Sequence, residues 1–157
     1  MKTDVKDHID YGSKKLFKEK FLDKFGIDEY YFPDNEFSRY DLAFKTKRLK
    51  SGEQVMCLVE LKVRRCNSTT YPNTLLEKKK FDIMNELAKQ VTVEKGIKCI
   101  PYYCAMFNDC YYMFRLDNVE YDVNMIRCRR TTDFNDQRMK TKDVIYMEFK
   151  NGTKYDY

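Results

Sequence analysis

The chain has 157 residues, of which 43% are hydrophobic and 35% are charged, and its 30 Lys and Arg exceed its 25 Asp and Glu to give a net charge of +5. This composition excludes disorder along the whole chain, and the length suits one domain, residues 1–157, with a sizeable core. The mild basic excess favours a polyanionic partner.

Membrane, secreted and zinc-binding classes are not expected. No stretch reaches the roughly 18 consecutive apolar residues of a membrane span, and the charged N-terminal segment lacks the apolar core of a secretory signal. The six cysteines form no Cys-x-x-Cys pair, and the single histidine, His8, is best interpreted as a surface residue. We therefore expect a cytoplasmic protein (the host cytoplasm if it is viral) with reduced cysteines and no membrane contact.

The first half of the chain predicts one helix followed by three strands. The helix is expected over residues 4–25, with Gly26 as its C-terminal stop. Its buried stripe is expected to be Phe17, Phe21 and Phe25. The strands are expected at Glu29–Phe32, Arg39–Lys47 and Gln54–Arg64.

The second half begins with a predicted helix at Pro72–Gln90, because Pro72 suits a first turn and Thr74 with Glu77 has capping-box spacing. Strands are then expected at Cys99–Phe107, Cys110–Leu116, Val119–Arg127 and Val144–Phe149. The expected fold class is α/β, a single domain with a mixed central sheet flanked by helices. The αβββαβ core would cover about residues 5–116, with extra C-terminal strands over about 117–157.

A pair of charges interrupts the apolar strand that contains Val59 and Leu61. Because side chains alternate between the faces of a strand, Glu60 and Lys62 point the same way. Charges at the end of a buried strand are costly unless a metal ion, a phosphate or a water-filled cleft receives them. Asp41, at the entrance of the preceding strand, would lie near Glu60 if the two strands form a hairpin. Two carboxylates at one point suit Mg²⁺.

The Glu-x-Lys pattern is weak evidence by itself, because it occurs three times in the chain. The triplet at Glu77 lies on a predicted helix, where spacing by two residues does not share a face. The triplet Glu148-Phe149-Lys150 also ends a strand, with Asp122 in an earlier one, but no helix follows to build a cleft. The alternative for Glu60 is an ordinary solvated strand end.

Lys80 is a second polar residue in an apolar pattern. It falls within the predicted helix stripe formed by Leu76, Ile83, Met84 and Leu87. Its side chain either extends outward to solvent or reaches a polar cleft and meets a phosphate there.

These residues resemble a known family. Asp41, followed after about 18 residues by Glu60-x-Lys62 at the end of an apolar strand in an αβββαβ order, resembles the PD-(D/E)xK nuclease superfamily. The resemblance is to small single-domain members found in bacteriophages and among Holliday-junction resolvases. It implies that Asp41, Glu60 and the backbone carbonyl of Leu61 bind Mg²⁺ or Mn²⁺, that Lys62 orients or activates the attacking water, and that the products carry a 5′-phosphate and a 3′-hydroxyl.

Other carboxylates remain alternatives in this resemblance. Asp34, in a literal Pro33-Asp34 pair, is a reserve for Asp41. Many members add an acidic residue from the first helix, for which Glu19 is the candidate by position and Asp10 by helix face.

The expected function is a metal-dependent nuclease acting on DNA, either a structure-directed endonuclease or an exonuclease. The alternatives are a catalytically silent nucleic-acid-binding chain and a protein-binding module such as a host-enzyme inhibitor. A homodimer is an open alternative to a monomer. The predicted nucleic-acid contacts are Arg64, Arg65, Lys78, Lys79, Arg129 and Arg130, and Arg127, Arg138 and Lys140 belong to further basic clusters.

Overall fold

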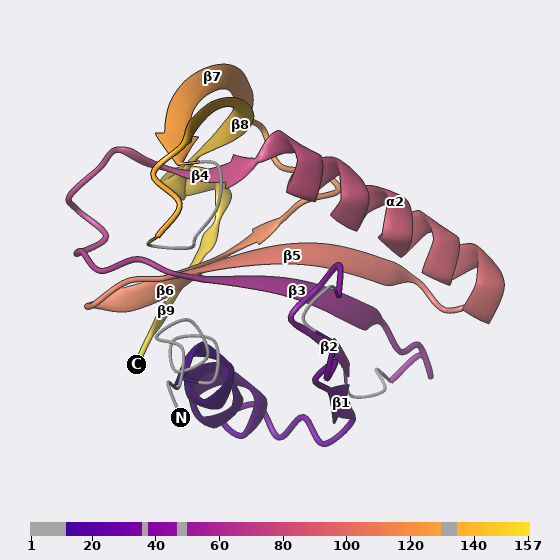
Figure 1. The fold of residues 1–157 in the computed structure, drawn as a ribbon. Helices are drawn as coiled ribbons and strands as arrows, with labels where there is room; N and C mark the ends of the chain where they lie inside the picture. The colour runs from indigo at the N-terminus through magenta and orange to yellow at the C-terminus, as the bar shows by residue number, and fades with distance from the viewer. Residues whose placement is uncertain (1–11, 36–37, 47–49, 130–134) are drawn as a thin grey trace.

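The computed structural model describes residues 12–35, 38–46, 50–129 and 135–157. Within these residues, the chain forms a six-stranded mixed sheet in the order β1-β2-β3-β5-β6-β9 and a three-stranded antiparallel sheet in the order β4-β8-β7. Figure 1 shows the long helix α2 on one side of the larger sheet and the N-terminal helix on the other. The α/β class with a mixed sheet is therefore confirmed.

The elements have the following bounds. The strands are β1 (Tyr30–Tyr31), β2 (Leu42–Lys45), β3 (Met56–Val63), β4 (Asn73–Glu77), β5 (Cys99–Met106), β6 (Cys110–Arg115), β7 (Asp122–Arg129), β8 (Met139–Glu148) and β9 (Thr153–Asp156). The helical elements with defined bounds are the π-helical turn η1 (Lys18–Leu22), the α-helix α2 (Lys78–Lys95) and the 3₁₀ turn η2 (Phe149–Asn151).

The N-terminal helix is α-helical over residues 12–17 and continues directly into η1. Its predicted start lies outside the described residues, whereas its predicted stop is confirmed, because Gly26 has a left-handed φ of 62°. Phe17 and Phe21 are buried as expected. Phe25 is 44% exposed, so its place in the buried stripe was wrong. The regular helix ends before Phe25, which lies in the closing turn.

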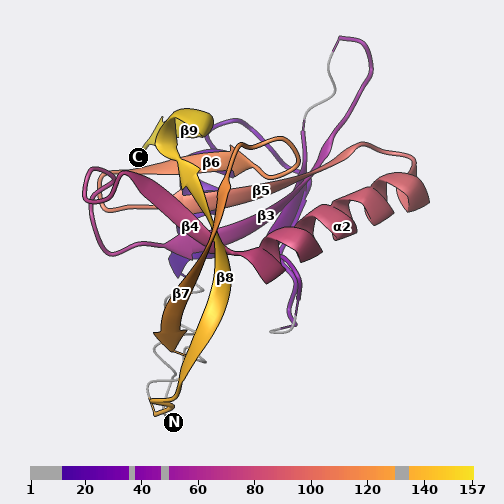
Figure 2. The same ribbon diagram turned by 90° about the horizontal axis from the view of Figure 1, so that it is seen from above.

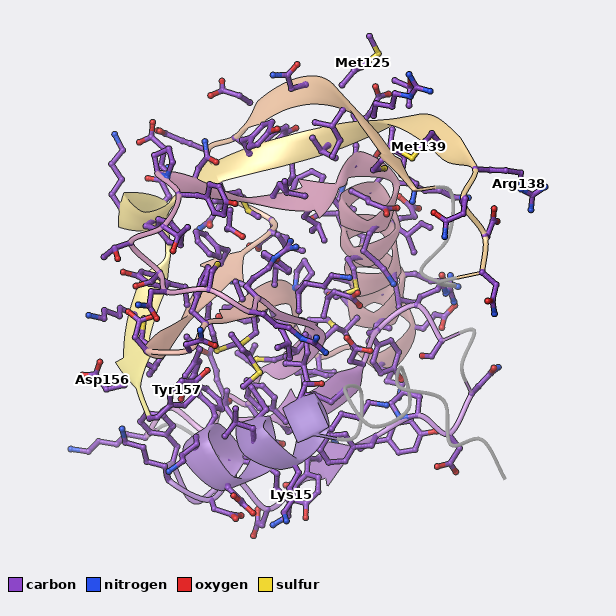
Figure 3. The ribbon with its side chains drawn as sticks, turned by 60° about the vertical axis from the view of Figure 1, so that its left-hand side comes forward. Lys15, Met125, Arg138, Met139, Asp156 and Tyr157 are labelled. Carbon is purple, nitrogen blue, oxygen red and sulfur yellow. The ribbon has the colours of Figure 1, made fainter. Side chains whose placement is uncertain are left out.

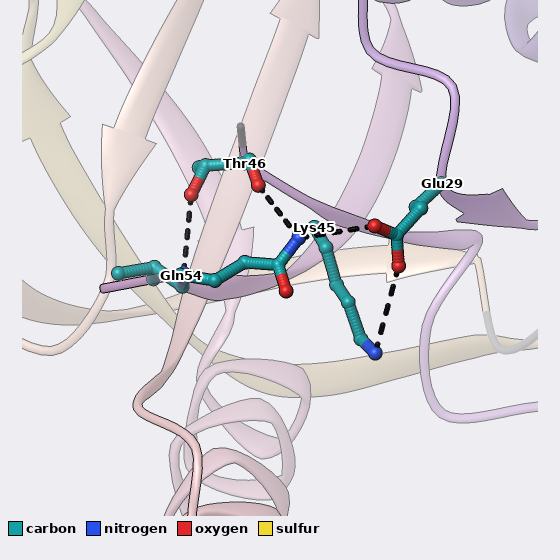
Figure 4. A network of polar contacts seen from close by, with 5 residues as sticks. Glu29, Lys45, Thr46 and Gln54 are labelled. Carbon is teal, nitrogen blue, oxygen red and sulfur yellow. Dashed lines mark hydrogen bonds and ion pairs between the residues drawn. The ribbon is translucent and has the colours of Figure 1, made fainter. Parts of the chain in front are cut away.

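The β2–β3 hairpin fixes the relative position of the two strands that carry the candidate site. Thr46 and Gln54 lie at its loop end (Figure 4), where Gln54 Nε2 donates to the Thr46 carbonyl at 3.0 Å and to Glu29 Oε1 at 3.2 Å. The Val55 N–H donates to Thr46 Oγ1 at 3.1 Å. Lys45 Nζ lies 3.7 Å from Glu29 Oε2. These contacts hold the antiparallel register at the end away from the site.

Two corrections concern the region before α2. Residues Asn73–Glu77 form strand β4 rather than the first turns of a helix, and the helix runs from Lys78 to Lys95, not from Pro72 to Gln90. The capping box was therefore wrong, because Thr74 pairs with Met147 of β8. Gly96 ends α2 with a left-handed φ of 64°. The helix connects β3 to β5, which are parallel, and β5 and β6 form the predicted antiparallel hairpin.

The C-terminal strands differ from the predicted ones in length and number. β8 begins at Met139, five residues before its predicted start, and β7 runs from Asp122 to Arg129. The unpredicted strand β9 pairs with β6 at the edge of the larger sheet. The C-terminal segment thus contributes to both sheets.

Two apolar clusters cover the two faces of the larger sheet. Leu58 of β3 packs in the cluster with α2, whereas Val59 and Leu61 pack in the cluster with the N-terminal helix. Because side chains alternate, Glu60 faces the α2 side together with Leu58. All six cysteines are free thiols. Among the described residues, no helix has the length and apolar character that a membrane span requires.

Candidate active site

The hairpin register brings Asp41 next to Glu60. Leu42 pairs with Val59, so the next position outward sets Asp41 opposite Glu60 on the same face. The Asp41 N–H donates to the Val59 carbonyl at 2.9 Å, which continues the ladder by one residue. Asp41 Oδ2 accepts a hydrogen bond from the Leu61 N–H at 2.7 Å. Asp41 is therefore held against the end of β3.

Glu60 is a largely buried carboxylate, with a side chain that is 14% exposed. Its neighbour in β5 is Tyr103, which is fully buried and covers that side of the strand. Burial, followed by the nearby charge of Asp41, raises the pKa of Glu60 to about 7, and the ammonium of Lys80 offsets part of this rise. A carboxylate in this position favours a neutralising partner.

Lys80 supplies one such partner from the first turn of α2. Its Nζ lies 3.3 Å from Glu60 Oε2, and its side chain is 32% exposed. No described residue donates a hydrogen bond to Glu60 Oε2, although this atom is buried. The side chain of Lys80 thus reaches the polar site rather than extending only to solvent, and its contact with Glu60 Oε2 is an ion pair without hydrogen-bond geometry.

Lys62 and Leu61 complete the part of the motif that lies on β3. Lys62 is exposed and pairs in register with Ala105, and alternation places its side chain on the face of Glu60. The side chain of Leu61 is buried, and its backbone N–H donates to the Asp41 carboxylate.

The structure does not bring the reserve carboxylates to this point. Glu19 is exposed on the N-terminal helix, which packs on the sheet face opposite to that of Glu60. Asp34 is exposed in the segment after β1, and Asp10 lies outside the described residues. Among the described residues, no group of three His, Cys, Asp or Glu side chains is arranged to hold a metal ion. The acidic site there consists of two carboxylates.

The predicted nucleic-acid contacts have different surroundings. Arg64 is turned inward, because its Nη2 donates to the Leu75 carbonyl at 2.8 Å and to the Tyr103 hydroxyl at 3.0 Å. This arginine supports the wall beside Glu60, a role that the sequence pattern did not indicate. Lys78 pairs with Asp82 at 2.6 Å.

The other predicted contacts are exposed or only partly described. Arg65 and Lys79 are exposed. Arg129 is described here only as part of the β7 backbone, and Arg130 lies outside the described residues.

The donor set at the site fits a hard divalent cation. Two neighbouring carboxylates and a backbone carbonyl offer oxygen ligands, and the hydrogen-bond-deficient oxygen of Glu60 has acceptor capacity to spare. Asp41, Glu60 and the carbonyl of Leu61 are the groups that would hold Mg²⁺ or Mn²⁺. A comparison of this chain with known protein families, characterised proteins and solved structures found no match.

Proposed function

We propose that this protein is a metal-dependent nuclease of the PD-(D/E)xK type that hydrolyses phosphodiester bonds in DNA. The observation that carries the proposal is the buried Glu60 carboxylate, which faces Asp41 from the neighbouring strand and lies 3.3 Å from the ammonium of Lys80. Burying an acid of this kind lowers the stability of a fold, so its presence favours a functional role. The order of a helix, three strands, a crossover helix and a parallel strand is a further supporting feature.

The residues divide the chemistry among them. Asp41 and Glu60 would hold a divalent ion, which would supply positive charge to the phosphate and lower the pKa of a bound water. Lys62 extends to solvent beside the carboxylates, where it can orient an attacking water. Lys80 adds positive charge close to the place where the phosphate gains negative charge. A junction-resolving endonuclease is the first expected activity and an exonuclease the second.

The test is a cleavage assay with Mg²⁺ or Mn²⁺ on single-stranded, duplex and four-way-junction DNA. Glu60→Gln keeps the size of the side chain and removes its charge, so we expect cleavage to fall by about 10²–10³-fold. The matched control is Glu148→Gln, which changes the glutamate of another Glu-x-Lys triplet whose side chain is 57% exposed. This control should retain wild-type activity.

A second measurement tests metal binding at the site without any DNA substrate. Mn²⁺ at about 100 times its Kd should stabilise the wild type by about 2.7 kcal/mol, and Glu60→Gln should remove this gain. Absence of cleavage on every DNA tested, with no stabilisation by Mn²⁺, would reject the nuclease proposal. Nucleic-acid binding that persists under those conditions would assign the chain to the catalytically silent class.

A further inference from the structure

Strands β7 and β8 continue as a two-stranded arm beyond the sheet that anchors them. β4 pairs with β8 only from Val144 to Glu148, whereas β7 and β8 pair from Asp122 to Arg129 and from Met139 to Tyr146. The arm is defined here as the paired residues 125–129 and 139–143. Figure 2 shows the two strands extending away from the larger sheet, and Figure 3 shows Met125 and Met139 at the outer surface.

The face of the arm that carries Met125, Arg127 and Met139 is open to solvent, whereas Ile126, Cys128 and Lys142 on the other face are half-buried. Met125 is 68% exposed and Met139 is 47% exposed, while Val144 and Ile145 at the root are completely buried. A two-stranded ribbon of this kind gains little stability from burial. The projecting ribbon is therefore accessible to a partner with a groove of matching width.

The arm and its connecting loop carry most of the net charge of the protein. The arm itself, residues 125–129 and 139–143, contains four Arg and Lys and one Asp, a net charge of +3, against +5 for the whole chain; the two Arg and two Asp of the loop cancel. Arg138 pairs with Asp136 at 2.9 Å and Lys142 with Glu77 at 2.8 Å. Arg127 and Lys140 are exposed and form no ion pair with any described residue.

The root of the arm touches the start of α2, where Lys80 reaches the candidate active site. Tyr121, just before β7, packs its ring 4.8 Å from that of Phe81, and Lys142 binds Glu77 at the N-terminal end of the same helix. Lys79, in the first turn of the same helix, is exposed. A polyanion held by the arm would thus pass close to the carboxylate pair.

We propose that the arm enters the major groove of duplex DNA, with Arg127 and Lys140 contacting phosphates at the groove edges. The inference rests on the proposed function for the identity of the polyanion as a nucleic acid. The major groove of B-form DNA, about 12 Å wide, admits a two-stranded β-ribbon, whereas the deep, narrow major groove of duplex RNA does not. A second copy of the chain fits less well, because it would set one net charge of +3 against another.

The test measures binding of a labelled 30-base-pair DNA duplex in EDTA, so that no cleavage occurs. The Arg127→Ala/Lys140→Ala variant should lose at least about tenfold in affinity at 0.1 M salt, and the slope of log K against log salt should fall by about 2. The matched control, Lys89→Ala/Lys98→Ala, removes two exposed lysines at the other end of α2 and should lose less than about twofold. A charge-conserving variant, Arg127→Lys/Lys140→Arg, should keep the wild-type slope.

Three results would overturn the proposal: wild-type affinity and slope in the alanine variant, an equal loss in the lysine control, or an equal loss for an RNA duplex of the same sequence. A dimer that Met125→Ser and Met139→Ser dissociate would assign the arm to a second copy and would also overturn it. The assay is independent of catalysis. Duplex binding through the arm without any cleavage would reject the proposed nuclease activity and retain the proposed role of the arm. Cleavage and binding that do not depend on Arg127 and Lys140 would reject the role of the arm alone.

Discussion

Glu60 and Glu148 each begin a Glu-x-Lys triplet in a strand of this protein, and the two glutamates have opposite surroundings. Glu60 of β3 has a side chain that is 14% exposed and lies against Lys80 from another element. Glu148 of β8 is 57% exposed and pairs with Lys150 of its own triplet at 3.0 Å, with the lysine 72% exposed. The same local sequence therefore gives a buried, electrostatically demanding site in one place and a surface ion pair in the other.

The difference arises from the neighbours of each strand. β3 lies between β2 and β5 and has α2 packed over the face that carries Glu60. Glu148 stands at the last residue of β8, opposite Asn73 at the start of β4. Asp122 pairs with Tyr146 rather than with Glu148, so no second carboxylate is set directly opposite. Burial by three elements, rather than the triplet itself, distinguishes a candidate site from a solvated strand end.

The largest expected difference between the two triplets is in catalysis by their lysines. Lys62→Ala should reduce cleavage by about 10²–10³-fold, because Lys62 is the group proposed to orient the attacking water. Lys150→Ala should leave cleavage unchanged, because Lys150 is exposed and pairs with an exposed glutamate. Single-turnover cleavage with excess enzyme measures both.

Lys62→Arg tests whether charge alone is enough, since a guanidinium keeps the charge and changes the geometry. Cleavage in Lys62→Ala at the wild-type rate, with Glu60→Gln inactive, would remove Lys62 from the mechanism and retain the carboxylates.

The fold could be predicted from sequence where the signal was local. The apolar run of β3 and the β5–β6 hairpin were both predicted correctly. β4 was not, because Asn73–Glu77 becomes a strand by pairing with β8, about 70 residues later in the chain. β9 and the outer half of β8 were also missed, because these mostly exposed segments lack apolar alternation.

The part of the candidate site that strand alternation and hairpin register determine could be predicted from the sequence. These two rules were enough to set Asp41 and Glu60 on one face. The inward turn of Arg64 was not predictable, because its partners Leu75 and Tyr103 come from β4 and β5. The exclusion of Glu19 depends on which face of the sheet the N-terminal helix covers, and helix periodicity does not specify that.

The second largest expected difference is a pH dependence of stability, which Glu60 should cause and Glu148 should not. The folded-state pKa of Glu60 is about 7, against an ordinary value of 4.5, so the folded protein binds more protons than the unfolded chain between these values. The metal-free protein should therefore lose stability as the pH rises from 5 to 8, by up to about 3 kcal/mol from this residue. Urea unfolding in EDTA measures it.

Glu60→Gln should flatten this part of the pH profile, and Glu148→Gln should follow the wild type. A wild-type profile parallel to that of Glu60→Gln would show that Glu60 has its ordinary pKa. The burial of Glu60 would then not distinguish its electrostatics from those of Glu148.

The smallest effect compares the lysines that pair with the two glutamates. Lys80→Met removes the cation beside Glu60 and should cost about 1–2 kcal/mol at pH 8, since it leaves a buried carboxylate without its partner. Lys150→Met should stay within about 0.5 kcal/mol of the wild type. At pH 5 the cost of Lys80→Met should shrink, because Glu60 is then protonated and needs no cation. An equal cost at both pH values would mean that Lys80 stabilises the fold through packing of its aliphatic chain, and not through the charge of Glu60.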